Sequence, residues 1–284
     1  MVVKNPVGIL MGGIAALCSM ALCLPSLRGG AKVQVGKPCT MPNRPSLAEV
    51  DHKPWNELLH KYVDDKGMVA YARWKADADD MQALDDYLAK AGCVDLKKAA
   101  PKEVRIAYWI NVYNALTIKG ILREYPIRSI RERAARLGGY NIWKDLLLWV
   151  DNRSLSLDDI EHQILRRMGE PRIHAALVCG AKGCPPLSSQ AYTGSSLDER
   201  LTENARKFFA RSDAFRVDSS GRTVYLSPLL KWYGGDFGAT TDEQLRNLKP
   251  LLPTEAAQAA ENPGVKVRFL DYDWNLNDRN PPSR

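Results

Sequence analysis

Reactive side chains concentrate in residues 171–186, where an apolar run that begins with a histidine ends in a glycine-rich turn between two cysteines. His174 could act as a general base or acid, and Cys179 and Cys184 could be nucleophiles, metal ligands or disulfide partners. The run 173–179 is short, apolar and stopped by glycine, which predicts a buried strand that delivers its last residue to a loop. We expect any active site to lie in this stretch.

The geometry of a strand limits the simplest pairing of these residues. Successive side chains alternate between the two faces, so His174 and Cys179 would point to opposite sides and lie about 16 Å apart along the chain. Cys184 could return alongside the strand if residues 180–183 reverse the chain. The same reversal could bring Cys179 and Cys184 within disulfide distance. The partner of each residue is therefore expected to come from elsewhere in the chain.

One hypothesis for this stretch is a cysteine-dependent hydrolase or acyl transferase. Cys179 or Cys184 would be the nucleophile and His174 the base, with Glu161 as the group that orients the imidazole ring. The glycine turn could supply backbone N–H donors for an oxyanion, and Lys182 would favour the thiolate and contact the substrate. All the groups that such a site needs are present in the sequence.

Glu161 belongs to a helix predicted for residues 156–168, with Ser156 as its N-cap. At about 100° per residue, Glu161 falls inside the apolar arc of this helix, and His162 falls just outside it and is more typical of a surface position. The arc is formed by Leu157, Ile160, Ile164, Leu165 and Met168. A buried carboxylate needs a partner, so either Glu161 forms an ion pair, with Arg172 as one candidate, or it serves a site.

A second buried helix is predicted for residues 101–122, because apolar side chains surround it almost completely. Asn111 and Asn114 fall on one stripe of this helix and face the interior. A buried amide without hydrogen-bond partners costs about 1–3 kcal/mol. Two interpretations remain open: the amides order the backbone of a neighbouring loop, or they bind a substrate oxygen.

Two alternatives compete with the enzyme. The chain could be a non-catalytic binding or envelope-associated module whose cysteines form a structural clip, or it could hold a metal or redox site at His174, Cys179 and Cys184. The metal site ranks last, because a closed zinc site usually has four ligands and only Glu161 or His162 could complete it. No bound metal or cofactor is predicted, and the expected ligand is a small molecule or a peptide.

The N-terminal segment predicts export. Lys4 precedes the apolar stretch 7–24, and small residues follow near position 31, which is typical of a signal peptide; an uncleaved anchor is the alternative. The mature chain is then expected to be periplasmic or extracellular, with membrane contact only through this segment if it is not cleaved. The domain plan has four parts: 1–31 signal peptide or N-terminal anchor, 32–54 flexible leader, 55–277 folded domain and 278–284 polar tail.

The net charge and the cysteine content indicate which partners and which compartment to expect. The formal net charge is +7 for the whole chain and +5 without Lys4 and Arg28. The charges are mixed along the sequence instead of forming a basic stripe, so nucleic acid is not an expected partner. Four cysteines follow the N-terminal segment, and an oxidising compartment permits disulfides in three possible connectivities. They are Cys39, Cys93, Cys179 and Cys184.

The pattern of elements predicts a single α+β domain. A buried central helix and further helices are expected to pack on a mixed or antiparallel sheet that contains residues 172–179, and a papain-like layout is one version. Further helices are expected near 55–63, 81–92, 197–209 and 242–252, a strand or strand pair within 142–153, a hairpin at 215–226 and a last strand at 265–270.

Several long motifs closely resemble the DUF547 family, in order, over about residues 55–277. They are AYWINVYNAL at 107–116, SLDDIEHQILR at 156–166, the stretch 171–187, LSPLLKWY at 226–233 and YDWNLN at 272–277. This family has no assigned function. The resemblance therefore implies no catalytic residue, and the chemistry must be argued from the side chains themselves.

Overall fold

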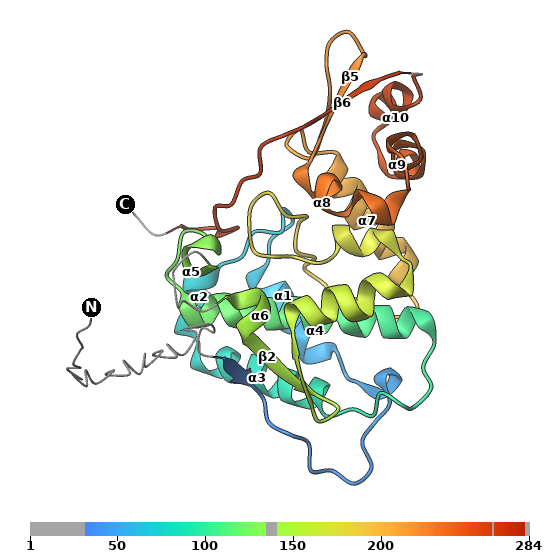
Figure 1. The fold of residues 1–284 in the computed structure, drawn as a ribbon. Helices are drawn as coiled ribbons and strands as arrows, with labels where there is room; N and C mark the ends of the chain where they lie inside the picture. The colour runs from blue at the N-terminus through green and yellow to red at the C-terminus, as the bar shows by residue number, and fades with distance from the viewer. Residues whose placement is uncertain (1–31, 135–140, 263, 282–284) are drawn as a thin grey trace, which may run out of the picture.

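The computed structural model of the chain describes residues 32–134, 141–262 and 264–281. The segment 1–31, with its predicted signal peptide or anchor, lies outside the described residues. The chain folds into helices and two small mixed sheets, which confirms the predicted α+β class. In Figure 1 the C-terminal elements, from α7 onward, form an upper part above the long helix α4.

Helix α4 (Lys102–Glu124) is the centre of the larger hydrophobic core, as its all-round apolar pattern predicted. Every residue from Ile106 to Ile118 is buried. It packs against α3 (Ala78–Gly92), and the neighbouring helices α1 (Lys53–Tyr62) and α2 (Tyr71–Ala76) add buried aromatic rings to the same core.

The first sheet contains β1 (Val33–Val35), β2 (Leu146–Val150) and β3 (Arg153–Ser156). Strand β1 is parallel to β2, and β2 is antiparallel to β3. The strand predicted within 142–153 is therefore present as β2, whereas its partner β1 lies outside the predicted range and β3 begins only at its last residue. The tight turn places Asp151 and Asn152 at φ of 50° and 57°, a left-handed conformation that Asp and Asn tolerate better than most residues. A disulfide between Cys39 and Cys93 ties the chain that follows β1 to the end of α3.

The second sheet belongs to the C-terminal part of the chain. The hairpin of β4 (Phe215–Val217) and β5 (Thr223–Leu226) is the predicted one, and β6 (Lys266–Phe269) joins β5 in parallel. A second, smaller cluster of buried apolar residues lies among these elements. The helices of this part are α7 (Leu197–Phe209), α8 (Pro228–Phe237), α9 (Thr241–Leu248) and α10 (Thr254–Ala260).

The strand predicted at 172–179 is wrong. Residues Pro171–Ala175 form a short 3-10 helix, η4, whose first turn is capped by the side chain of Glu170. Beyond it the chain is irregular, because the side chain of Asn114 binds Ala176 O at 2.9 Å and Val178 N at 3.0 Å and so replaces the partners that a neighbouring strand would supply. Neither sheet contains this stretch, and the expectation that His174 and Cys179 face opposite sides fails with it.

The helix predicted at 156–168 is present, with an unexpected backbone pattern. Asp159–Leu165 is a π-helix, η2, followed by the 3-10 turn Arg166–Met168, and it ends at Gly169 with φ of 64°. Single π-turns are rare and are often found at functional sites. Glu161 is buried and His162 is partly exposed, as the helical wheel predicted.

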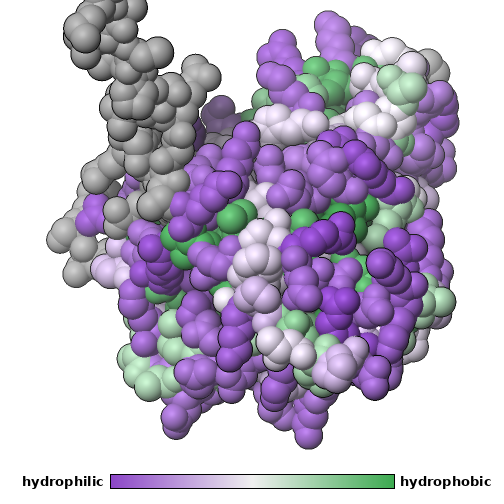
Figure 2. All heavy atoms as spheres, turned by 60° about the horizontal axis from the view of Figure 1, so that its bottom comes forward, coloured by the Kyte–Doolittle hydropathy of each residue, from purple (hydrophilic) through white to green (hydrophobic). Residues whose placement is uncertain are grey.

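Two short helices complete the larger part of the fold. They are α5 (Arg131–Ala134) and α6 (Ile142–Asp145), and the second leads directly into β2. On the face that Figure 2 shows, hydrophilic residues predominate and apolar ones gather only in small separate areas. Among the helices of the described residues, none combines the length and the hydropathy needed to span a bilayer.

Candidate functional site

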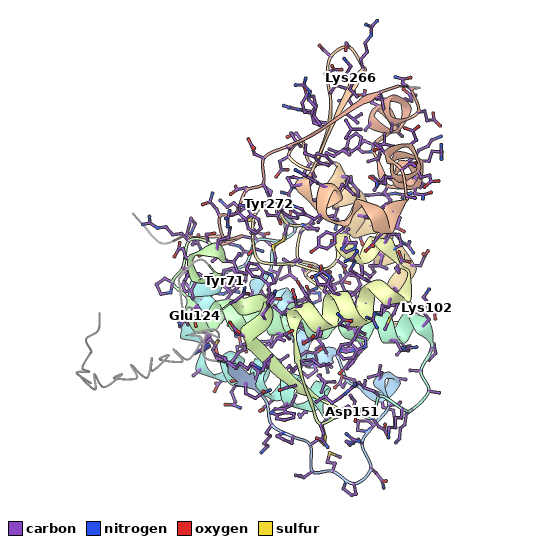
Figure 3. All side chains as sticks on the ribbon, in the orientation of Figure 1. Tyr71, Lys102, Glu124, Asp151, Lys266 and Tyr272 are labelled. Atoms are coloured by element: carbon purple, nitrogen blue, oxygen red, sulfur yellow. A yellow bond between two sulfur atoms is a disulfide. The ribbon has the colours of Figure 1, made fainter. Side chains whose placement is uncertain are left out.

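A pocket of about 370 Å³ lies where α4, η2, η4 and α8 meet the C-terminal segment that follows β6. Tyr272, on that segment, lies between the upper C-terminal part and the rest of the molecule in Figure 3. The pocket is lined by Tyr113, Trp143, Asp158, Glu161, His162, His174, Leu177, Cys179, Cys184, Leu229, Trp232, Tyr233, Tyr272 and Trp274.

The pocket brings together residues that the sequence singled out from separate motifs. Glu161 from η2, His174 from η4 and both cysteines of the following loop lie in its lining. A larger pocket of about 640 Å³ opens around His52 and Arg200 and contains none of the predicted site residues. The smaller pocket is therefore the candidate functional site, because the predicted reactive side chains line it.

Glu161 is held by tyrosines and not by the arginine that the sequence suggested. Tyr113 Oη donates to Glu161 Oε2 at 3.0 Å, and the hydroxyl of Tyr233 lies close to the same carboxylate. Arg172 instead pairs with Glu170 at 2.7 Å and with Asp198 at 2.8 Å, so the proposed pair with Glu161 is wrong. Burial raises the pKa of Tyr113 well above its ordinary value, and the tyrosine remains a donor.

His174 is oriented by Asp236, on α8, and not by Glu161. The distance from His174 Nε2 to Asp236 Oδ2 is 2.7 Å, and the ring of Tyr233 stacks on the imidazole with centroids 4.1 Å apart. Burial lowers the pKa of His174, although the nearby carboxylates of Asp236 and Glu161 oppose the shift. The neutral imidazole is thus the favoured form.

The tautomer of His174 follows from the state of Asp236. Arg166 Nε and Nη2 donate to the two oxygens of Asp236 at 2.6 and 2.7 Å, and this pair lowers the pKa of Asp236 to about 2. Because the carboxylate can only accept, Nε2 of His174 carries the proton and Nδ1 keeps its lone pair. No pattern in the sequence indicated Asp236, apart from its position shortly after the 226–233 motif.

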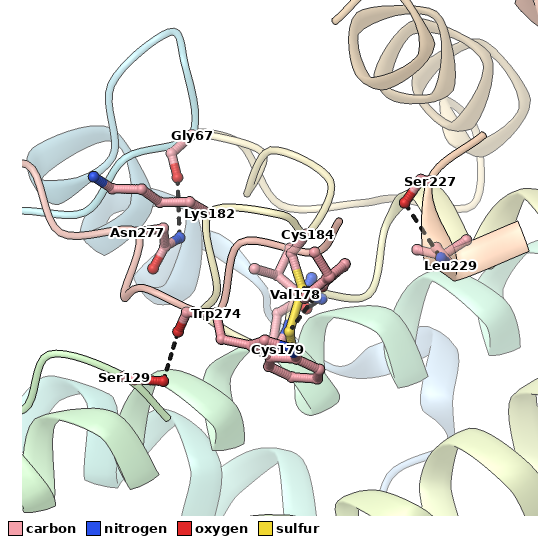
Figure 4. Close-up of a disulfide and its surroundings, with 12 residues drawn as sticks. Gly67, Ser129, Val178, Cys179, Lys182, Cys184, Ser227, Leu229, Trp274 and Asn277 are labelled. Carbon is pink, nitrogen blue, oxygen red and sulfur yellow. Dashed lines mark hydrogen bonds between the residues drawn. A yellow bond between two sulfur atoms is a disulfide. The ribbon is translucent and has the colours of Figure 1, made fainter. Parts of the chain in front are cut away.

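The two cysteines of the loop are bonded to each other. Cys179 and Cys184 form a disulfide with Cα atoms 6.4 Å apart, and Figure 4 shows it beside Trp274. Cys184 Sγ accepts hydrogen bonds from the backbone N–H of Cys179 and from the hydroxyl of Tyr272, both at 3.1 Å. Neither sulfur is a free thiol in this state.

Three other predicted residues lie outside the pocket lining. Asn111 binds the backbone O and N of Tyr192 at 2.8 and 2.9 Å, and Asn114 binds the loop at 176–178, so the geometry supports the backbone-ordering interpretation. The side chain of Lys182 points away from the disulfide in Figure 4. A contact of these residues with substrate stays a prediction without support from the geometry.

The pocket also has an aromatic wall, formed by three residues that were not predicted to belong to the site. Trp232, Tyr272 and Trp274 lie with ring centroids 4.6 to 5.8 Å apart. These residues belong to the motifs at 226–233 and 272–277, so the only available signal was their place in those motifs. Trp232 is 46% exposed, which is unusual for so large an apolar side chain.

The third hypothesis from the sequence included a metal site at His174, Cys179 and Cys184. Within the part of the chain that the structure describes, no group of three or more His, Cys, Asp or Glu side chains is arranged to hold a metal ion. The disulfide also takes the two cysteines out of the proposed ligand set.

Comparison with known proteins agrees with the motifs. Residues 97–209 match the model of DUF547, described as a protein of unknown function, which supports the resemblance to this family. The matched range includes the buried helix α4, the π-helix η2 and the disulfide loop, whereas the aromatic wall lies beyond it. No curated protein and no solved structure matches the chain.

Proposed function

We propose that the pocket binds a small organic cation, such as an alkylammonium group on a small molecule or on a peptide. The main support for this proposal is the composition of the pocket lining. Six aromatic side chains and the acids Asp158 and Glu161 line the pocket, and the lining contains neither Lys nor Arg, although the chain has a net charge of +7. Aromatic faces attract ammonium groups by about 0.5–2 kcal/mol each, more where water is excluded.

The buried carboxylate of Glu161 supports the same ligand class. Glu161 accepts a hydrogen bond from the hydroxyl of Tyr113, and among the described residues no Lys or Arg forms an ion pair with it, although Arg166 acts on its charge at longer range. A cation in the pocket would supply an ion-pair partner, because a buried charge is stabilised by an opposite charge nearby.

The hydrolase or acyl transferase that the sequence suggested has weaker support. Such an enzyme needs a free thiolate, and Cys179 and Cys184 are joined in a disulfide. The binding module therefore accounts better for the site. Export to an oxidising compartment is part of this proposal, and the two disulfides are compatible with it.

Calorimetric titration tests the ligand class. A trimethylalkylammonium compound should bind, and its neutral isostere, with carbon in place of nitrogen, should bind at least about tenfold more weakly. Glu161→Gln should weaken binding of the ammonium by about tenfold. Glu203→Gln, which removes a carboxylate on α7 that pairs with Lys207, is the matched control and should leave the affinity unchanged. Equal binding of the isostere, or no binding of either compound, would contradict the proposal.

A further inference from the structure

The disulfide in the pocket lining differs from the other disulfide of the chain in its surroundings. Cys184 Sγ accepts two hydrogen bonds, from the N–H of Cys179 and from Tyr272 Oη. Among the described residues, no donor contacts either sulfur of the Cys39–Cys93 pair. Hydrogen bonds to a sulfur favour its thiolate form and make it a better leaving group.

The two sulfurs of the pocket disulfide also differ in access. Cys184 is 5% exposed, whereas Cys179 is partly exposed and lines the pocket. A nucleophile that enters the pocket therefore meets Cys179 Sγ first, and the sulfur that would leave is the one that holds the two donors.

The loop between the cysteines is anchored at several points. Arg211 donates to Cys184 O at 2.8 Å and to Lys182 O at 2.7 Å. The backbone N–H groups of Lys182 and Gly183 donate to the C-terminal segment at Asn275 O and Asp273 O, at 2.7 and 2.9 Å. Opening the disulfide would leave these bonds intact, so the two sulfurs would stay close enough to close again.

From these contacts we propose that Cys179–Cys184 is a thiol–disulfide exchange site, at which a thiol that enters the pocket attacks Cys179. The thiolate RS⁻ forms a bond to Cys179 Sγ, the Cys179–Cys184 bond breaks, and its electron pair leaves on Cys184 Sγ as a thiolate. A second RS⁻ then attacks the sulfur of R in the mixed disulfide and releases RSSR and the Cys179 thiolate. Two thiols are oxidised and one disulfide is reduced, and the closing reaction is the reverse.

Tyr272 is the positioning residue of this exchange. Its hydroxyl lies 3.1 Å from Cys184 Sγ and 3.5 Å from Cys179 Sγ. Burial raises the pKa of Tyr272 above its ordinary value, so the hydroxyl keeps its proton and can donate to the thiolate at neutral pH.

The test uses the oxidised full chain and the neutral thiol 2-mercaptoethanol, so that its outcome is independent of the proposed ammonium ligand. Samples are alkylated at intervals and the four cysteines are quantified by peptide mass spectrometry. Cys179–Cys184 should open at least about tenfold faster than Cys39–Cys93, which serves as the control within the same molecule. Equal rates, or a faster opening of Cys39–Cys93, would overturn the proposal.

Two sets of variants separate the roles of the residues. Tyr272→Phe should slow the opening of Cys179–Cys184 by about five- to tenfold and leave Cys39–Cys93 unchanged, because only one donor to the leaving sulfur is lost. Cys184→Ser should form a mixed disulfide with bis(2-hydroxyethyl) disulfide at Cys179 faster than Cys179→Ser does at Cys184. An unchanged rate in Tyr272→Phe, or the opposite order of the single-cysteine variants, would contradict the assigned roles.

Discussion

Asp236 on α8 lies 2.7 Å from Nε2 of His174 on η4, and this contact joins the two parts of the fold at the pocket. The same carboxylate receives two hydrogen bonds from Arg166, which follows the π-helix η2. Three separate segments thus meet at one carboxylate. The pocket keeps its shape only if these segments keep their relative positions.

Asp236→Asn should destabilise the protein by about 1–2 kcal/mol at neutral pH, since charge-assisted hydrogen bonds to Arg166 and His174 are weakened while solvent screens part of the effect. Because the folded-state pKa of Asp236 is lowered from 3.8 to about 2, its contribution is present above pH 3.8 and is lost as the pH falls toward 2. Urea unfolding of both proteins at a series of pH values measures this. A difference that stays constant down to pH 2 would contradict it.

His174 should titrate with a midpoint below its ordinary value of 6.5, because burial favours the neutral ring. Its contribution to stability is therefore full above pH 6.5 and is lost as the pH falls through the lowered midpoint. Glu161→Gln should lower the midpoint of His174 further, since the carboxylate favours the charged ring. NMR titration of the imidazole signals checks this, with His52, whose pKa burial lowers to about 4, as the control that Glu161→Gln leaves unchanged.

The sequence predicted those helices and strands whose pattern of apolar and polar residues is visible within the segment itself. The all-round apolar run of α4 requires burial wherever the helix packs, and the β4–β5 hairpin follows from two short apolar runs around Ser219, Ser220 and Gly221. The position of Glu161 on the buried side of its helix was predictable for the same reason.

Only some of the site residues could be predicted, because the contacts that position the others come from segments that are far away in the sequence. The stretch 173–179 has the composition of a strand, yet Asn114, which lies 62 residues before Ala176, supplies its hydrogen bonds and leaves it irregular. Asp236 and Tyr272 have no local pattern that distinguishes them from other acids and tyrosines. Their roles follow only from the fold, which places α8 and the C-terminal segment against the disulfide loop.

Asn114→Ala should cost about 2–4 kcal/mol, because it leaves two buried backbone groups at 176–178 without partners. It should also alter the pocket, since Leu177 in that stretch is part of the lining. Asn111→Ala is the matched control: it removes an equivalent pair of hydrogen bonds to Tyr192 and should lower stability without changing ligand affinity. Unfolding and ligand titration of both variants are the measurements, and equal losses of affinity would argue against this division.

Gly180, the first residue of the disulfide loop, should be more sensitive to an added side chain than Gly169. Its φ is 85°, which disfavours any other residue, and an added Cβ would meet the side chain of Ile121 in α4. Gly180→Ala should therefore destabilise by about 2–3 kcal/mol, the sum of the backbone cost and of the shift that the terminal methyl of Ile121 must make. Gly169→Ala provides the control, because φ is 64° there and nothing lies within 4 Å of the added carbon, so only the backbone cost of about 1–2 kcal/mol remains. Similar losses in the two variants would show that the contact with Ile121 is unimportant.

The two disulfides should differ in their contributions to stability as they differ in reactivity. Cys39 and Cys93 are 54 residues apart, and closing such a loop stabilises the fold by about 4 kcal/mol in the chain-entropy description. Cys179 and Cys184 are 5 residues apart, and the same description gives about 2 kcal/mol. Replacing each pair with serines and measuring urea unfolding should give losses in this order. A larger loss for the 179–184 pair would mean that this disulfide is mainly a structural clip. That result would contradict the role in exchange that we assign to its two hydrogen-bond donors.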